Sequence, residues 1–453
     1  TPARLEIFSK FARETYFGNM RGQYFPYMLT GRGVTRSGYT MRSGNVGLAR
    51  SLMNTDPTHK DEYELIAKKL ENTAHSSQGI TPISKLYYIG DYISHNRPGY
   101  QYSIRTTSSR TYRSEWGNDE GYETYFMSDA SNAILQEGNE YGNIYGVWDW
   151  AKIPGVTNPL LPRGHIPNSQ SSMAAGTSTR GTQPFVGGVT DNLYSAYVYT
   201  QRDSWVTNNR QGKRVSISTI ADKAWFMFDE EIVCLGSSLT SNATHADLGD
   251  LELITTVNQG LLKGEVLVGT KSGNVEKYAL GANKEFDNNV QWVIHNNIGY
   301  VFPKGGQARL ETATKSGAWS DNNYSESNET VSEDLFALWL SHGKKAKNEE
   351  YVYFVIPNVS SAADIQEYWD SKLKDIEILE NNDAIQAVRH KALGIWQIIF
   401  RKPATFKHNE LILKANQPGA VMVKDIDTET GKASVYVGDV MQYGKILKFG
   451  LDI

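Results

Sequence analysis

Two segments near the N-terminus carry hydrophobic residues at helical spacing. Over Pro2–Tyr16 the apolar side chains recur every three or four residues, and Asp61–Leu70 repeats that pattern. Asn54–Pro57 offers capping side chains and a proline just before the second segment. The glycine-rich stretch Leu29–Gly38 lies between them and predicts a break. We therefore expect residues 1–75 to be helical with one irregular interruption.

From about residue 80 the pattern changes to the alternation typical of β-strands. Clusters of glycine, asparagine and serine separate the alternating runs at hairpin intervals. No regular helix alternates with these runs, so a parallel α/β sheet is disfavoured and a large antiparallel sandwich is expected. The predicted strands include Tyr100–Arg105, Asn192–Thr200, Val215–Ile220, Glu265–Val268, Val290–Ile294 and Tyr300–Phe302.

One pair of predicted strands is apolar almost throughout. Lys223–Phe228 and Ile232–Leu235 are joined by the acidic turn Asp229–Glu231. A continuous apolar run between turn residues is typical of a strand that is buried on both faces. We expect this hairpin to lie in the middle of the sandwich.

The last hundred residues form a further series of predicted strands. Leu335–His342 fits a strand or a short helix, Tyr351–Pro357 begins the new series, and Asp364–Trp369 fits a helix. The chain is therefore mainly β, with a short helical N-terminal part. We divide it into residues 1–75, 76–350 and 351–453, the last a smaller β-sandwich.

Composition narrows the class of protein. A chain of 453 residues exceeds what one hydrophobic core usually supports, so two or three domains are expected. The single cysteine, Cys234, excludes a disulfide framework, and the lack of an 18-residue apolar run excludes a transmembrane helix. There is no initial Met, and residues 1–20 lack a signal-type apolar core, so we expect a processed or excised chain.

Aromatic residues are abundant, with 26 Tyr, 10 Trp and 15 Phe beside 40 Gly. This combination suits large β-sheets and suits grooves that bind sugars. It fits an aromatic-rich β protein without a sugar site equally well, so composition leaves both interpretations open.

Charge is distributed unevenly along the chain. Residues 1–113 hold 16 Lys and Arg against 8 Asp and Glu, whereas the whole chain has a net charge of −4. Arginine dominates the basic residues of this part, and its planar guanidinium binds carboxylate, sulfate or phosphate through paired hydrogen bonds. The excess predicts an anionic ligand bound at one place, with a solvated or internally paired face as the alternative.

The segment Gly31–Arg36 is the clearest candidate for binding that anion. It lacks the lysine of a phosphate loop and does not match the dinucleotide-binding glycine pattern. It places Arg32 and Arg36 four residues apart beside glycines that permit close approach of the backbone. Together they could hold one anionic sugar; a purely structural pair of arginines is the alternative.

Two further segments combine acids and aromatic residues. Tyr112–Gly121 contains Glu115, Trp116 and Asn118, which suit either the rim of a carbohydrate site or an exposed hairpin tip. Tyr145–Thr157 contains two Trp around Asp149, and we expect these Trp side chains in the core rather than as a sugar platform. The nine histidines are scattered without metal-ligand spacing, and no Gly-x-Ser-x-Gly motif is present, so neither a metal site nor a serine hydrolase is predicted.

Four blocks carry a resemblance to a known family. Gly31–Arg36, Val147–Thr157, Lys223–Gly236 and Thr255–Gln259, in this order, resemble the family of chondroitin AC, hyaluronate and xanthan lyases. The resemblance implies an incomplete α/α toroid, then a central β super-sandwich, then a small C-terminal β-sandwich. It implies that residues 1–75 are the last helices of such a toroid.

The resemblance also implies a chemistry, the β-elimination of a uronate-containing polysaccharide. A base removes the C5 proton of the uronic acid and the bond to O4 breaks, which requires neutralisation of the sugar carboxylate and a proton for the leaving oxygen. In this family an Asn, a His and a Tyr act beside two arginines, which Arg32 and Arg36 match. Glu115 and Asn118 resemble residues of the family's β-domain, where the Glu orients the network of His and Arg, and Trp116 lies between them as a further candidate for binding substrate. No metal and no cofactor is expected; Asp149 remains at the position of a calcium site seen in some members, but Ala151, Leu160 and Leu161 replace further ligands.

The sequence departs from the family in one respect. No histidine precedes Arg32, and Tyr16, Tyr24 and Tyr27 are too close to it to match the family's spacing. We expect the chain to be the C-terminal part of a larger lyase that binds substrate weakly by itself, with a separate or missing toroid segment as a partner.

The expected ligand is an acidic polysaccharide, chondroitin sulfate first, with hyaluronan or xanthan as alternatives and neither nucleic acid nor membrane as a partner. A non-catalytic carbohydrate-binding β-sandwich protein is the alternative from another class. The resemblance implies a secreted or periplasmic bacterial protein.

Overall fold

The N-terminal part of the chain is helical, as predicted. The computed structural model describes residues 1–115, 117–169, 180–409, 411–444 and 448–452. Its first 75 residues contain three α-helices: α1 (Pro2–Lys10), α2 (Val46–Thr55) and α3 (Lys60–Leu70). They share a small apolar core in which Tyr63 and Ala49 are completely buried. The glycine-rich interruption contains one short 3-10 turn, Gly31–Thr35. None of the helices in the described ranges is long and apolar enough to cross a membrane.

Three antiparallel sheets form the central part. A four-stranded sheet contains β1 (Ile83–Tyr87), β2 (Tyr92–Arg97), β3 (Tyr100–Arg105) and β4 (Ser131–Leu135). A five-stranded sheet contains β5 (Thr157–Pro159), β12 (Glu252–Leu261), β15 (Asn283–Glu285), β18 (Ala308–Gly317) and β19 (Val331–Lys344). An 11-stranded sheet contains β6 (Gly187–Thr190), β7 (Ser195–Asn208), β8 (Arg214–Met227), β9 (Ile232–Ser241), β10 (Thr244–His245), β11 (Gly249–Asp250), β13 (Val266–Thr270), β14 (Val275–Tyr278), β16 (Val290–His295), β17 (Ile298–Val301) and β20 (Glu349–Pro357).

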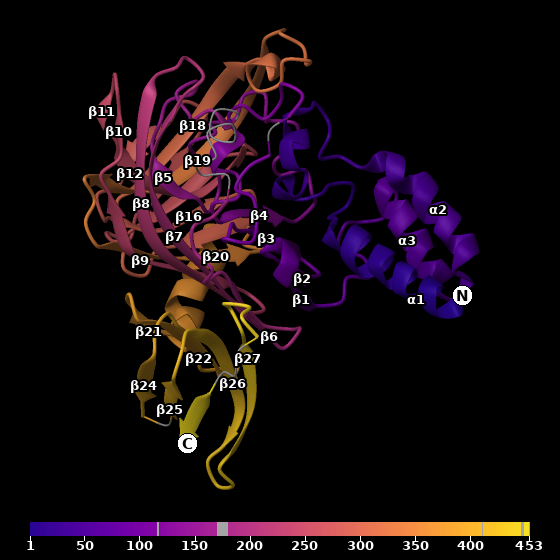
Figure 1. Cartoon of the computed structure of the whole chain (residues 1–453), viewed down its shortest axis with the longest axis vertical. Coiled ribbons are helices and arrows are strands. Elements are labelled where there is room, and N and C mark those ends of the chain that lie inside the picture. The colour runs from indigo at the N-terminus through magenta and orange to yellow at the C-terminus, as the bar shows by residue number, and fades with distance from the viewer. Residues whose placement is uncertain (116, 170–179, 410, 445–447, 453) are drawn as a thin grey trace.

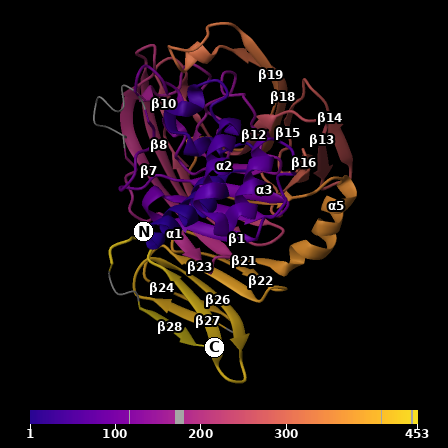
Figure 2. The same ribbon diagram turned by 90° about the vertical axis from the view of Figure 1, so that its right-hand side faces the viewer.

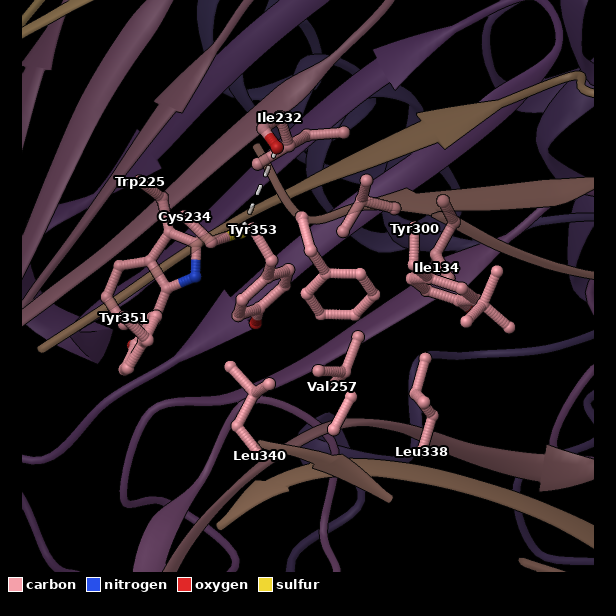
Figure 3. Packing of buried hydrophobic residues seen from close by; sticks show 14 of the residues in the cluster. Ile134, Trp225, Ile232, Cys234, Val257, Tyr300, Leu338, Leu340, Tyr351 and Tyr353 are labelled. Carbon is pink, nitrogen blue, oxygen red and sulfur yellow. Dashed lines mark hydrogen bonds between the residues drawn. The ribbon is translucent and has the colours of Figure 1, made fainter. Parts of the chain in front are cut away.

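The large sheet is buried on both faces at its centre, as the continuous apolar hairpin predicted. Strands β8 and β9 pair in register from Lys223–Gly236 to Met227–Ile232. Because side chains alternate along a strand, Cys234 enters one core while its neighbours Val233 and Leu235 enter another. Figure 3 shows the first of these cores, where Trp225, Cys234 and Tyr353 of the large sheet face Val257, Leu338 and Leu340 of the five-stranded sheet.

Two smaller sheets form the C-terminal sandwich. One contains β21 (Ile376–Asn381), β22 (Ile385–His390), β23 (Ile395–Phe400), β26 (Gly419–Asp427) and β27 (Lys432–Gly438), and the other contains β24 (Ala404–His408), β25 (Leu411–Ala415) and β28 (Phe449–Asp452). Their shared core includes Trp396, Phe406 and Leu413. In Figure 1 these sheets lie below the central ones, while the helices α1–α3 lie to one side.

One predicted strand lies in a different sheet from the one expected. Tyr351–Pro357 was predicted to begin the C-terminal sandwich, but it belongs to β20, which pairs with β9 and β17 in the 11-stranded sheet. Its alternate residues contribute to both cores of that sheet. The helix α5 (Ala362–Glu367) and the turns after it then lead to the C-terminal sheets, as Figure 2 shows. Leu335–His342, for which strand and helix were both open, is part of strand β19.

Candidate active site

The arginine-bearing loop is a tight turn that needs glycine at two positions. Gly31 has φ +56°, a conformation that favours glycine, and any Cβ there would collide with the carboxylate of Glu115. A Cβ on Gly33 would collide with the ring of Tyr39. The glycines therefore let the turn lie directly on an acid on one side and on an aromatic ring on the other.

Arg32 and Arg36 are joined by one shared carboxylate. Arg32 Nε donates to Glu120 Oε1 at 2.6 Å, and Arg36 donates from Nη2 to the same oxygen at 2.6 Å and from Nε to Oε2 at 2.8 Å. Arg32 also donates from Nη1 to Glu115 Oε1 at 2.5 Å and from its backbone N–H to Glu115 Oε2 at 3.2 Å. The two guanidinium groups are thus held side by side on one internal anion, the Glu120 carboxylate.

Glu120 is the fixed centre of this network. Its side chain is only 4% exposed, against 25% for Arg32 and 39% for Arg36. Asn323 supports it from the far side, through a backbone bridge and a hydrogen bond from Nδ2 to Oε2 of 3.3 Å. The hydrogen bonds from Arg36 lower the pKa of the Glu120 carboxyl, and the same contacts raise the pKa of Arg36. Both partners stay charged across the neutral range.

The arginines keep free donors on their exposed sides. Arg32 Nη2 and Arg36 Nη1 have no hydrogen-bond partner within the described ranges of the chain. Arg36 lies 5.1 Å from the ring centre of Tyr39, and Arg42 lies over the same ring at 4.0 Å. The site therefore presents unused guanidinium N–H groups beside an aromatic face, which suits an anionic sugar.

The other predicted site residues have different positions. Glu115 contacts Arg32, but its side chain is 52% exposed, so it covers the outer edge of the network rather than its centre. Asn118 is exposed, with φ +55°, on the bend that carries Glu120. Trp116 lies outside the described residues.

Sequence reasoning missed two residues of the site. Glu120 lies in a segment that was singled out, but three acids occur there and only burial distinguishes Glu120 from Glu115 and Asp119. For Tyr39, the only feature of the sequence that pointed to the site was its position three residues after Arg36. Both residues become evident only when the turn and the bend are brought together in space.

The Trp-Asp-Trp segment is structural, as expected. Trp148 and Trp150 are almost completely buried and pack edge-to-face at 5.2 Å. Beside them, Lys152 Nζ lies 3.2 Å from Asp149 Oδ2 and 3.2 Å from Glu311 Oε2, over the ring of Trp339. The Lys152 ammonium group thus pairs with both acids, and Lys315 Nζ also lies 2.6 Å from Glu311 Oε1. The described part of the chain contains no group of three or more His, Cys, Asp or Glu that could hold a metal ion.

This fold and site define a class of protein. The model for the super-sandwich domain of polysaccharide lyase family 8 matches residues 82–368, more than half of the chain, and the model for the family's C-terminal beta-sandwich domain matches residues 377–445. The chain belongs to polysaccharide lyase family 8.

Individual relatives agree with this assignment. Chondroitinase-AC of Pedobacter heparinus is 32% identical over 443 residues, which cover 98% of this chain and 58% of that protein. Hyaluronate lyase of Thermasporomyces composti is 24% identical over 371 residues, covering 80% of this chain and 43% of the relative. The chain thus spans about half of the length of these relatives.

Solved structures show the same architecture. A chondroitinase AC lyase, described in work on its oligosaccharide complexes, superposes with a TM-score of 0.86 at 31% identity and covers 100% of this chain and 62% of that one. A xanthan lyase of Paenibacillus shares the fold alone, with a TM-score of 0.73 at 21% identity, covering 94% of this chain and 41% of the other.

Proposed function

We propose that this chain is the substrate-binding part of a lyase that cleaves a uronate-containing polysaccharide by β-elimination, with chondroitin sulfate as substrate. The observation that carries the proposal is the pair of guanidinium groups held by Glu120, each with unused donors on its exposed side. The relationship to chondroitinase-AC of Pedobacter heparinus, at 32% identity over nearly the whole chain, supports the choice of substrate.

The proposed chemistry follows from the charge that develops during the reaction. Removal of the C5 proton places negative charge on the uronate carboxylate, and cleavage at C4 places it on the departing oxygen. Arg36, the more exposed arginine, would bind the anionic group of the substrate. Arg32, held on two sides by Glu120 and Glu115, would stabilise charge at the leaving oxygen. Glu120 and Glu115 are positioning residues in this scheme.

A base and an acid are also required. No histidine precedes Arg32, so we propose that a toroid segment outside these 453 residues, on the parent chain or on a separate one, supplies the His and Tyr that the family uses. The chain itself would then bind acidic oligosaccharides weakly and cleave little. We propose a secreted or periplasmic location, because such polysaccharides are extracellular. Hyaluronan and xanthan remain alternative substrates, since enzymes acting on each are among the relatives.

The test is the ultraviolet absorbance of unsaturated uronate, followed with the intact parent chain on chondroitin sulfate, hyaluronan and xanthan. We expect absorbance to rise fastest with chondroitin sulfate. A chain that binds these polysaccharides without any rise is a carbohydrate-binding protein, and the lyase proposal is then wrong. Faster cleavage of hyaluronan or xanthan would overturn only the choice of substrate.

A further inference from the structure

A cavity lies next to the arginine network, between the N-terminal segment and the four-stranded sheet. Its volume is about 590 Å³. Phe11, Tyr16 and Phe25 come from the N-terminal side, and Tyr87 and Tyr92 come from the sheet. The cavity is therefore walled mainly by aromatic rings, which pack well against the apolar face of a sugar ring.

Two arginines lie in this aromatic wall, and no acid lines it with them among the described residues. None of the twelve described residues that line the cavity is Asp or Glu, whereas Arg42 and Arg105 both line it. Neither side chain forms an ion pair or donates a hydrogen bond to any residue in the described ranges. The buried arginines elsewhere in the first 113 residues, such as Arg21, Arg97 and Arg113, have acceptors close by.

The two arginines are held in different ways. Arg42 lies 4.0 Å from the ring centre of Tyr39 and 5.7 Å from that of Phe25, so aromatic faces orient its guanidinium group. Arg105 ends strand β3 opposite Tyr92, and its Nε is buried without a partner among the described residues. Burial lowers the pKa of Arg105, and the nearby charge of Asp91 offsets that effect only in part, which leaves room for further compensation. An anion bound here would supply that compensation.

Several other polar groups of the wall take part in hydrogen bonds within the protein. Asn19 donates from Nδ2 to Tyr87 Oη at 2.9 Å and accepts from Tyr92 Oη at 3.1 Å. Tyr16 Oη accepts from Asn45 Nδ2 at 2.9 Å. The guanidinium groups of Arg42 and Arg105 are the charged groups of the described lining, and they have donors to offer a ligand.

Tyr39 connects this cavity to the candidate active site. Its ring lies between Arg36, 5.1 Å away, and Arg42, 4.0 Å away, and it lines the cavity itself. A polysaccharide whose uronate contacts Arg36 could place a neighbouring sugar across Tyr39. Arg36 and Arg42 thus contact the same ring, one from the candidate active site and one from the cavity.

We propose that this cavity is a second subsite, which binds an oxyanion-bearing sugar of the acidic polysaccharide through Arg42 and Arg105 against an aromatic wall. The inference rests on the proposed function and extends it to the recognition of a further charged sugar. The oxyanion is a sulfate ester or a second uronate carboxylate, which share the same guanidinium chemistry.

The experiment is a calorimetric titration of the 453-residue chain with three probes: chondroitin 4-sulfate, chondroitin 6-sulfate and desulfated chondroitin hexasaccharides. The variants are Arg42→Gln and Arg105→Gln. Arg36→Ala tests the first site, and Arg214→Gln, an exposed arginine of β8 that does not line the cavity, is the matched control. Arg42→Gln alters a half-exposed side chain, so it keeps the test valid if Arg105→Gln fails to fold.

Arg42→Gln and Arg105→Gln should each weaken binding of a sulfated hexasaccharide about tenfold or more, the effect expected for one charge-assisted hydrogen bond, while Arg214→Gln binds as the wild type does. Weakening confined to the sulfated probes identifies a sulfate ester, and equal weakening with the desulfated probe identifies a carboxylate. Wild-type affinity in both Arg42→Gln and Arg105→Gln, with weaker binding in Arg36→Ala, overturns the subsite and leaves the proposed function standing. If no probe binds the wild-type chain, the subsite is overturned, whereas the proposed function is decided separately by the absorbance assay on the intact parent chain.

Discussion

At the scale of the residue, the candidate site depends on one buried carboxylate. Glu120 accepts three hydrogen bonds from the guanidinium groups of Arg32 and Arg36, and Asn323 supports it from behind. An exposed ion pair contributes little to stability, but a buried acid that fixes two arginines also fixes where their free N–H groups point. Glu120 therefore prepares the site before any substrate binds.

The substitution Glu120→Gln tests this role. It should lower the free energy of unfolding by about 2 kcal/mol, because it leaves two cations without their shared anion at a partly buried position. Glu115→Gln, at a half-exposed position, should cost less than about 1 kcal/mol. Denaturant unfolding of both variants measures the difference, and equal effects would show that burial of Glu120 has no special role.

The sequence predicted the arginines but not their partner. Arg32 and Arg36 were recognisable in the sequence because they are four residues apart and have glycines beside them. Glu115, Asp119 and Glu120 are chemically alike in one bend, and the choice among them depends on how the bend packs against Asn323, about 200 residues further along the chain. Interactions of that range leave no local pattern.

At the scale of the element, strands that alternate strictly or are apolar throughout were predictable, whereas the sheet to which a strand belongs was not. The hairpin β8–β9 was evident from its composition. Strand β20 was equally evident, but its pairing with β9 and β17 depends on residues far away in sequence. Periodicity determines that a strand forms and which residues share a face, and it carries no information on the neighbouring strand.

A substitution of Trp148 can show whether this side chain stabilises the core or binds a sugar. Trp148 is fully buried and packs against Tyr27 at 4.9 Å and Trp150 at 5.2 Å. Trp148→Ala should lower the free energy of unfolding by about 3–5 kcal/mol, the usual cost of a large core cavity. A stable variant with weakened oligosaccharide binding would instead place this Trp in the binding site.

His295, the last residue of strand β16, should make the stability of the protein depend on pH. His295 is 4% exposed, stacks on Phe336 at 4.1 Å and accepts a hydrogen bond from the backbone N–H of Lys263. Burial, with the nearby Lys263 charge, lowers the pKa of His295 from 6.5 to about 3. The neutral form is therefore favoured in the folded state, and its stabilisation is complete above pH 6.5 and disappears as the pH falls toward 3.

His295→Gln removes this titration while keeping an acceptor for Lys263. Between about pH 7.5 and 5.5 the wild type should lose roughly 1 kcal/mol more unfolding free energy than the variant does. The reason is that each pH unit below about 6.5 costs the wild type about 1.4 kcal/mol. Urea unfolding at the two pH values gives this difference. Parallel pH dependence in the two proteins would contradict the assignment.

At the scale of the whole molecule, the arginine network lies where the N-terminal segment meets the central sheets. Arg32 and Arg36 belong to the N-terminal segment, whereas Glu115 and Glu120 lie between β3 and β4 of the four-stranded sheet, and Asn323 follows β18. The site therefore forms only when these parts pack together. Such an arrangement couples the geometry of the site to the position of the helices, which Figure 1 shows beside the large sheets.

The most direct test of the account is the rate at which the intact parent chain forms unsaturated uronate from chondroitin sulfate, with Arg32→Ala and Arg36→Ala compared with the wild type. Removal of one charge-assisted hydrogen bond to the substrate should cost about 1.5–3 kcal/mol, which lowers kcat/KM about tenfold or more. We predict that Arg32→Ala mainly lowers kcat, because it removes charge stabilisation at the leaving oxygen, and that Arg36→Ala mainly raises KM. Wild-type kcat and KM in both variants would contradict the assignment of the site.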